Sequence, residues 1–132
     1  MAGPTVMFGL ETTYLALDGA GAVTPMEGGE AFWRNVEGSA AAGGTLVTVN
    51  GGEGDWPHWE MHPAGEEVLV VLEGTARILF EHPDGRTQTL EMTPGVTLTV
   101  PRGVWHRALG QRRLKTLFIT YGAGTQHRPA LA

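Results

Sequence analysis

The sequence predicts an all-β protein, a sandwich or barrel built from short antiparallel strands. Two observations favour this fold class, and a third favours a single domain. The chain has 20 glycines and 8 prolines in 132 residues, and these residues interrupt it so often that long helices have little room. Between them lie short runs rich in β-branched and aromatic residues, which are typical of strands. The length suits one domain, because a chain of this size buries roughly two thirds of its unfolded surface in a single core.

The N-terminal part of the chain has the weakest pattern. We expect a strand over residues 12–17 and a loop over 19–29. Residues 30–36 fit either a strand or one helical turn, and we leave that choice open. Residues 1–44 as a whole are predicted to form a segment that packs on the barrel or on a partner subunit.

From residue 45 onward the strands are easier to place. Thr45 to Asn50 is rich in β-branched residues and ends at Asn50-Gly51-Gly52, which predicts a strand followed by a turn. Pro83-Asp84-Gly85 is a hairpin turn signal. Further strands are expected over 57–62, 67–73, 75–82, 86–91, 97–100, 104–109 and 114–121. The barrel is therefore predicted over residues 45–121, and residues 122–132 are interpreted as a loose C-terminal extension.

The run Val68 to Leu72 is apolar on both faces of its predicted strand, whereas a strand with one wet face alternates. Something must therefore cover its outer side. The cover is either the N-terminal segment or a second subunit, and an isologous dimer is the commonest way to bury such a surface. We expect a homodimer.

Composition excludes several classes of function. The formal net charge of −5 argues against general nucleic-acid binding, which needs a concentrated basic surface. No apolar run approaches the ~20 residues of a membrane span. The start Met-Ala-Gly-Pro does not resemble a secretory signal, so we expect a cytoplasmic protein. The chain has no cysteine, so any metal must be bound through nitrogen and oxygen.

One group of residues has the pattern of a metal site. His58, Glu60 and His62 are spaced by two, so on a strand their side chains point to one face. A carboxylate from the next strand, Glu66 or Glu67, can return to the same volume, and periodicity does not choose between the two. His106 follows the tight turn that begins at residue 101. Imidazole and carboxylate groups gathered from separate strands suit a divalent first-row metal ion.

Two stretches of the chain resemble the motifs of the cupin superfamily. Gly54 to Gly74 is similar to the first motif, which spaces a glycine, two histidines, a glutamate and a second glycine. Gly95 to Gly110 is similar to the second motif, with a proline, a glycine and a histidine in register. The resemblance implies a double-stranded β-helix, or jelly-roll, barrel. It also implies that His62, Glu67 and His106 are metal ligands.

Two positions depart from the cupin pattern. Glu60 stands where the first histidine is expected, and Gly110 where the motif ends in asparagine. If Glu60 is the fourth ligand, two carboxylates favour harder ions such as manganese or iron(II) over copper. The resemblance leaves a divalent ion, Mn, Fe, Ni or Zn, as the expected cofactor. His58, one inward step of ~6.6 Å away along the strand, is the alternative fourth ligand.

The resemblance implies a class of function but no reaction. We expect a metal-dependent enzyme, a dioxygenase or an isomerase, that acts on a small oxygenated molecule, with His58 as the candidate general base. The alternative is a non-catalytic module that binds or senses a small ligand or a metal. Trp56 is expected at the pocket mouth, and Trp59 and Trp105 under an N-terminal flap or at a subunit interface. His82 and His127 are interpreted as ordinary polar residues.

Overall fold

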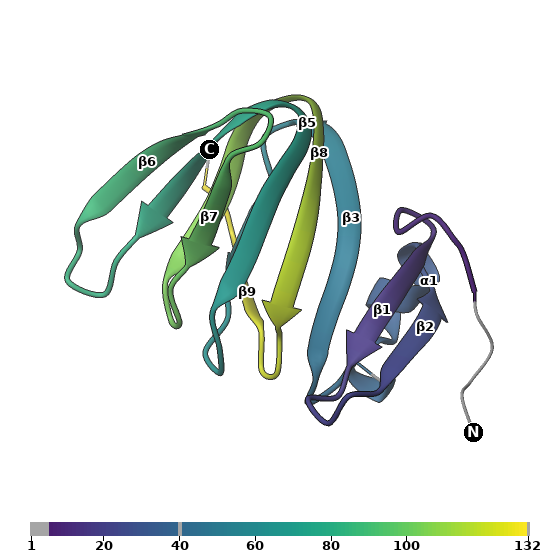
Figure 1. Ribbon diagram of the computed structural model, residues 1–132. Helices are drawn as coiled ribbons and strands as arrows, with labels where there is room; N and C mark the ends of the chain where they lie inside the picture. Colours follow the sequence, from purple (N-terminus) through teal and green to yellow (C-terminus); the bar gives the residue numbers. More distant parts are fainter. Residues whose placement is uncertain (1–5, 40, 132) are drawn as a thin grey trace.

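The computed structural model describes residues 6–39 and 41–131 of the chain. Strands make up most of it and curl into a jelly-roll barrel, which confirms the predicted fold class (Figure 1). In chain order the elements are β1 (Thr13–Leu17), β2 (Val23–Glu27), α1 (Glu30–Arg34), the 3-10 turn η1 (Val36–Gly38), β3 (Thr45–Gly54), β4 (His58–Met61), β5 (Glu67–Glu81), β6 (Thr87–Met92), β7 (Thr97–Val100), β8 (Trp105–Tyr121) and β9 (Gln126–Pro129).

The strands form one antiparallel network. Its main path runs β2-β1-β3-β8-β4-β9, and β5 joins it through β8 while also pairing with β6 and β7 (Figure 1). The ladders align one inward-facing row of buried residues across four strands: Ala16, Leu46, Thr120 and Glu67. The register thus places a carboxylate, Glu67, in the interior of the barrel.

Strands β5 and β8 are each one long strand, whereas the sequence pattern predicted two strands for each. The first half of β5 pairs with β7 and the second half with β6, while β8 runs beside both halves. The ladder shifts register around residues 71–77 instead of ending. Gly74 allows this bend, because its φ of 74° favours glycine and a Cβ there would lie 2.3 Å from the Arg113 carbonyl oxygen.

Two apolar clusters stabilise the fold. The larger fills the barrel between β5, β6, β7 and β8, and its fully buried members include Leu69 and Ile78. The smaller joins the N-terminal strand to the barrel through Tyr14, Phe32 and Leu46. The described N-terminal residues therefore pack on the barrel of their own chain.

Both ends of the described chain hold strands that the sequence pattern missed. Strand β2 lies where a loop was expected, and the open choice over residues 30–36 resolves as the short helix α1 followed by η1. Strand β9 pairs with β4, so the segment after residue 122 is not loose. Both missed strands carry a proline at a sheet edge, where a missing amide hydrogen costs no ladder bond.

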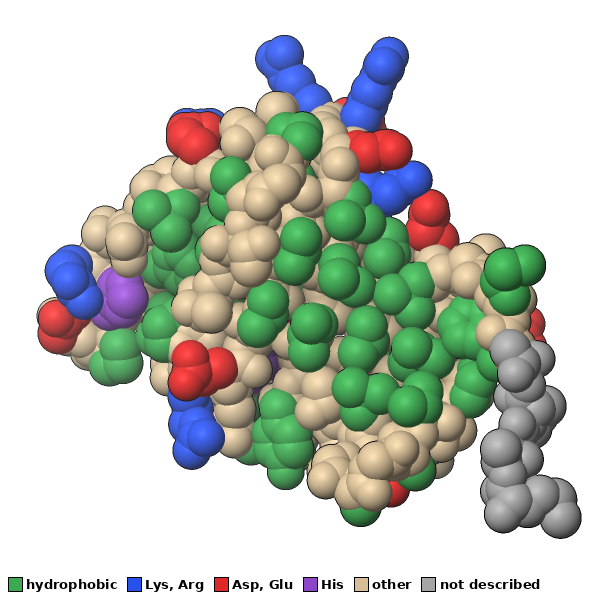
Figure 2. Space-filling model, viewed as in Figure 1, with side chains coloured by type: hydrophobic (Ala, Val, Ile, Leu, Met, Phe, Trp, Pro, Cys, Tyr) green, Lys and Arg blue, Asp and Glu red, His purple; other side chains and the backbone are tan. Residues whose placement is uncertain are grey.

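The outer side of the barrel carries an exposed apolar surface, which we call the outer apolar face. Figure 2 shows hydrophobic side chains gathered across β5, β8 and β3. The described residues of the N-terminal segment do not cover this face, because β1 extends the sheet beside β3 instead. The outer apolar face comprises the half-buried Leu15, Val47, Val68, Val70, Leu117 and Ile119, and the exposed Leu72.

Among the described residues, no helix is long and apolar enough to cross a membrane.

Candidate metal centre

The barrel brings together the four residues that the sequence predicted as ligands. Glu60 lies on β4 opposite His106 of β8 in the ladder, and Glu67 begins β5. His62 directly follows β4, and its carbonyl oxygen accepts a hydrogen bond from the Gly103 amide at 3.0 Å. This bond holds the turn before β8 against the end of β4, so the two histidines stay close together, with ring centroids 5.2 Å apart.

These side chains are close and largely buried. Glu67 Oε1 lies 3.3 Å from His62 Nε2 and 3.3 Å from His106 Nε2. Glu60 Oε1 also lies 3.3 Å from His62 Nε2, so this nitrogen is close to two carboxylates. His62, Glu67 and His106 are 2%, 2% and 0% exposed, while the side chain of Glu60 is 24% exposed. Glu66, the alternative carboxylate, is exposed.

Hydrogen bonds to their second polar atoms orient the three buried side chains. The Thr125 hydroxyl donates to the Gly122 carbonyl at 2.7 Å, so at 2.8 Å from His62 it accepts the Nδ1–H. His106 Nδ1 lies 3.2 Å from the Val104 carbonyl oxygen, which can only accept. The neutral form of each imidazole therefore has its lone pair on Nε2, which faces the other ligands. Thr120 donates its hydroxyl to Glu67 Oε2 and leaves Oε1 free.

Three buried atoms at the centre of the cluster have no aligned hydrogen-bond partner among the described residues. They are His62 Nε2, Glu67 Oε1 and His106 Nε2. Buried polar atoms without partners are rare and costly. Here Glu67 Oε1 lies 3.3 Å from each of the two imidazole nitrogens, which matches the spacing of ligand atoms around an ion with bonds of about 2.1 Å. The donor set therefore fits a divalent metal ion.

The charges of the cluster also shift its titration. Burial alone would raise the pKa of Glu67, but the His106 and His62 imidazoles hold it below its ordinary value. Burial would likewise raise the pKa of Glu60, yet His127 and His62 lower it. Burial would lower the pKa of His62, but Glu60 and Glu67 raise it to about 9. A site with this much negative charge attracts a cation, either a proton or a metal ion.

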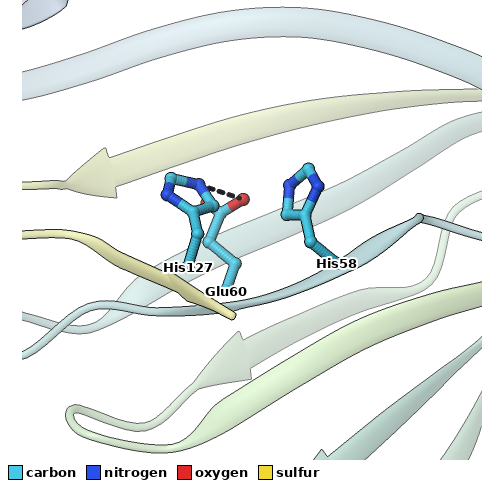
Figure 3. A group of neighbouring side chains, drawn as sticks. All are labelled: His58, Glu60 and His127. Carbon is cyan, nitrogen blue, oxygen red and sulfur yellow. Dashed lines mark ion pairs between the residues drawn. The ribbon is translucent and has the colours of Figure 1, made fainter. Parts of the chain in front are cut away.

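His58 and His127 lie beside this cluster. His58 projects from β4 on the same face as Glu60, and His127 lies opposite Glu60 across the β4–β9 ladder. His127 Nε2 is 3.6 Å from Glu60 Oε2, an ion pair that raises the pKa of His127 (Figure 3). This ion pair agrees with the interpretation of His127 as an ordinary polar residue that has a partner. His82 has a partner too, since its Nε2 lies 3.2 Å from Gln88 Oε1.

A cavity of about 1330 Å³ opens onto the cluster. Aromatic side chains line part of its wall, among them Trp33, Trp56 and Phe118, and polar groups such as Asn50 and Gln111 line another part. Trp56 lies beside His106, with ring centroids 6.1 Å apart. Helix α1 and η1 form one rim of the cavity.

The other two tryptophans pack against a residue of the C-terminal strand. Arg128 of β9 lies between their rings, 5.0 Å from the Trp59 centroid and 4.6 Å from the Trp105 centroid. The cover over them is therefore the C-terminal strand and not an N-terminal flap. Arg128 also pairs with Glu81 at 2.7 Å. Sequence reasoning missed this packing because Gln126 to Pro129 has no apolar alternation.

Comparison with known proteins identifies the barrel. The family model described as "Cupin domain" matches residues 45–120. A search of curated proteins found no match. Among solved structures, the chain is similar to peruvianin-I, a cysteine peptidase from Thevetia peruviana latex, with a TM-score of 0.54, 17% identity and 67% of the chain covered. A Bacillus subtilis oxalate decarboxylase with Mn(II) centres gives a TM-score of 0.52, 19% identity and 65% coverage.

A further similar structure is a recombinant oxalate oxidase in complex with glycolate, with a TM-score of 0.51, 16% identity and 63% of the chain covered. The chain spans only part of each of these proteins: 56% of peruvianin-I, 23% of the decarboxylase and 44% of the oxidase. At such identities the likeness concerns the fold.

Proposed function

Because this chain belongs to the cupin family, we propose that it is a metal-dependent enzyme, of oxygenase or isomerase type, that acts on a small oxygenated molecule. One observation supports the proposal most strongly: His62 Nε2, Glu67 Oε1 and His106 Nε2 converge in the barrel interior, buried and without a hydrogen-bond partner among the described residues. A proton on an imidazole nitrogen is donated to one carboxylate oxygen at a time, whereas a divalent metal ion accepts lone pairs from all of its ligands at once. The proposed ligands are Glu60, His62, Glu67 and His106.

The residues around the proposed ion have separate tasks. The ion, when bound, supplies a Lewis acid that polarises a substrate oxygen. Glu60 and Glu67 together balance its double charge, and the Thr125 hydroxyl keeps the His62 lone pair on Nε2. Trp56 lines the cavity beside His106 and excludes water from the substrate side. His58, which lines the same cavity, is the proposed proton acceptor.

Manganese is the first ion to test. Two carboxylates among four ligands favour a hard dication, and manganese and iron(II) fit this donor set better than copper. The structurally similar oxalate decarboxylase has Mn(II) centres, which supports the same choice. Nickel and zinc are the next candidates.

The cavity supports a substrate class larger than a two-carbon acid. Its volume of about 1330 Å³ exceeds the 300–1,000 Å³ of ordinary small-molecule pockets. Aromatic rings on one wall and amide side chains on another suit a partly apolar molecule with oxygen atoms that approach the ion. The cysteine peptidase activity of peruvianin-I does not transfer, because this chain has no cysteine nucleophile.

The experiment compares metal-free protein with and without added MnCl₂. We expect about one tightly bound Mn²⁺ per chain and a higher melting temperature, since 100-fold excess over Kd stabilises a protein by about 2.7 kcal/mol. His106→Ala and Glu67→Gln should lose the ion, while the control His82→Ala should keep it. Tight binding that survives in both variants, or no binding to the wild type, would refute the metal centre. A non-catalytic binding module, the alternative, would bind metal and ligand without turnover.

We also propose that the protein is a homodimer that buries the outer apolar face. In the ladders, Val47 and Val68 flank Ile119, and Val70 lies beside Leu117, so the face is continuous over three strands. Sedimentation equilibrium at micromolar concentration should give twice the chain mass, and Val68→Asp should give a monomer. A monomeric wild type would contradict the proposal.

A further inference from the structure

Two histidines outside the buried cluster and one of its carboxylates lie on one face of the β4–β9 pair. His58 and Glu60 are two residues apart on β4, and His127 is the register partner of Glu60 on β9. Each offers one ligand atom, and these atoms all lie within 4.8 Å of one another. Figure 3 shows the two imidazoles on either side of the Glu60 carboxylate.

We propose that His58, Glu60 and His127 form a second divalent-cation site, and that Glu60 is shared between this site and the buried centre. The proposal rests on the proposed function only through that shared carboxylate. It assigns His58 and His127 to metal binding, and a metal-bound His58 nitrogen cannot act as the general base at the same time.

The two oxygens of Glu60 face different partners. Oε1 lies 3.3 Å from His62 Nε2, in the buried cluster, and Oε2 lies 3.6 Å from His127 Nε2, on the outer side. A carboxylate with one oxygen toward each site is a suitable bridge between two cations. Two imidazoles and one carboxylate are also a ligand set that zinc sites use while leaving a position open.

The second site is accessible and adjustable. His58 and His127 line the large cavity and also a separate surface hollow of about 500 Å³, which includes Pro57, Arg128 and Pro129. An ion can therefore reach the site from outside the barrel. The ligand atoms of a tetrahedral zinc ion lie roughly 3.4 Å apart. The side chain of His127 is 54% exposed and His58 is half-buried, so both imidazoles are free to close in.

The number of carboxylates at each site predicts which of the two sites binds a metal ion first. Glu60 and Glu67 together balance one dication, and the buried centre uses both of them. The outer site has only its share of Glu60, through Oε2. The second ion should therefore bind more weakly than the first, which separates the two binding steps in a titration.

The test uses ZnCl₂ as the probe on metal-free wild-type protein, with calorimetric titration and elemental analysis after equilibrium dialysis. We expect two ions per chain for the wild type. His127→Ala and His58→Ala should each lower the affinity of the weaker step by about tenfold or more and leave the tight step within about threefold. His82→Ala, which removes a histidine elsewhere on the surface, should keep both steps. Melting temperatures of the metal-free variants check that each one folds.

Different outcomes separate this inference from the proposed function. One ion in the wild type, or a weak step unchanged in His127→Ala and His58→Ala, overturns the second site and leaves the buried centre standing. Loss of the tight step in His127→Ala also overturns it, because His127 then belongs to the first site. If His106→Ala loses only the tight step and keeps the weak one, the second site is supported separately. If His106→Ala keeps the tight step and the two outer variants lose the weak one, the second site stands and the buried centre fails.

Discussion

Replacing Thr125 by valine tests how the protein orients its buried ligands. The Thr125 hydroxyl lies 2.8 Å from His62 Nδ1 and is the hydrogen-bond partner of that atom in the described part of the chain. Valine has almost the same shape but cannot accept the Nδ1–H. His62 then either loses that hydrogen bond or moves its proton to Nε2, where it occupies the lone pair needed for a metal ion.

The size of the effect follows from that choice. Loss of a partner that fixes a histidine ligand typically lowers metal affinity by about 10–100-fold, equivalent to about 1.4–2.8 kcal/mol. Thr125 is half-buried, so water can reach the vacated position, and the metal-free protein should lose only about 1 kcal/mol of stability. The variant should thus bind metal poorly while remaining folded.

The assay is calorimetric titration of metal-free Thr125→Val with ZnCl₂ at pH 7.5, with thermal unfolding as the check on folding. Thr125→Ser keeps the hydroxyl and serves as the matched control, and its tight step should stay within about threefold of wild type. If Thr125→Val binds the tight ion as strongly as the wild type, the hydroxyl does not orient His62. If serine fails as badly as valine, the threonine acts through packing.

Three further predictions concern charge, backbone contact and the C-terminal strand. Below pH 6.5 the protonated His62 contributes its full stabilisation to the metal-free protein, and this stabilisation is lost as the pH rises through about 9. Urea unfolding in the presence of a chelator should therefore show lower stability at pH 9.5 than at pH 6. The difference should disappear when His62 is replaced by glutamine. Gly51→Ala should lower the free energy of urea unfolding by about 2 kcal/mol or more, because its Cβ would lie 1.9 Å from the Leu114 carbonyl oxygen. Gly52→Ala, with its nearest contact at 3.5 Å, should have a mild effect, and equal effects would contradict the steric reason. Arg128→Ala should lower the stability by about 1–2 kcal/mol and expose the amides of β9 to hydrogen exchange, because the guanidinium contacts two tryptophan rings. Unchanged exchange would mean that the β4–β9 ladder alone holds the strand.

The sequence predicted the centre of the fold far better than its ends. Short β-branched runs between glycines located most of the barrel strands, and the strand over 97–100 agrees with the structure at both ends. The spacing of Glu60 and His62 also predicted that they lie together, because side chains two residues apart in an extended chain share a face. These features depend on local periodicity, which the sequence displays directly.

The missed features depend on contacts between distant parts of the chain. Thr125 is 63 residues from His62, and its hydroxyl carries no pattern that marks it as a partner. His127 lies in a polar strand that exists because β4 offers it an edge. Strands β5 and β8 look interrupted at Gly74 and near Gly110, since sequence shows the glycines but not the ladder that continues past them.

The position of β8 also has a consequence for how the chain folds. It pairs with β3, β4 and β5, three consecutive strands that all precede it in the sequence, and each of them has an unsatisfied edge until β8 arrives. During synthesis the earlier strands must therefore wait for residues 105–121 to emerge from the ribosome before the barrel can close. Folding should accordingly be slow and limited by the closure of long loops. Nascent chains that stop before β8 should be the species most prone to aggregation and most dependent on chaperones.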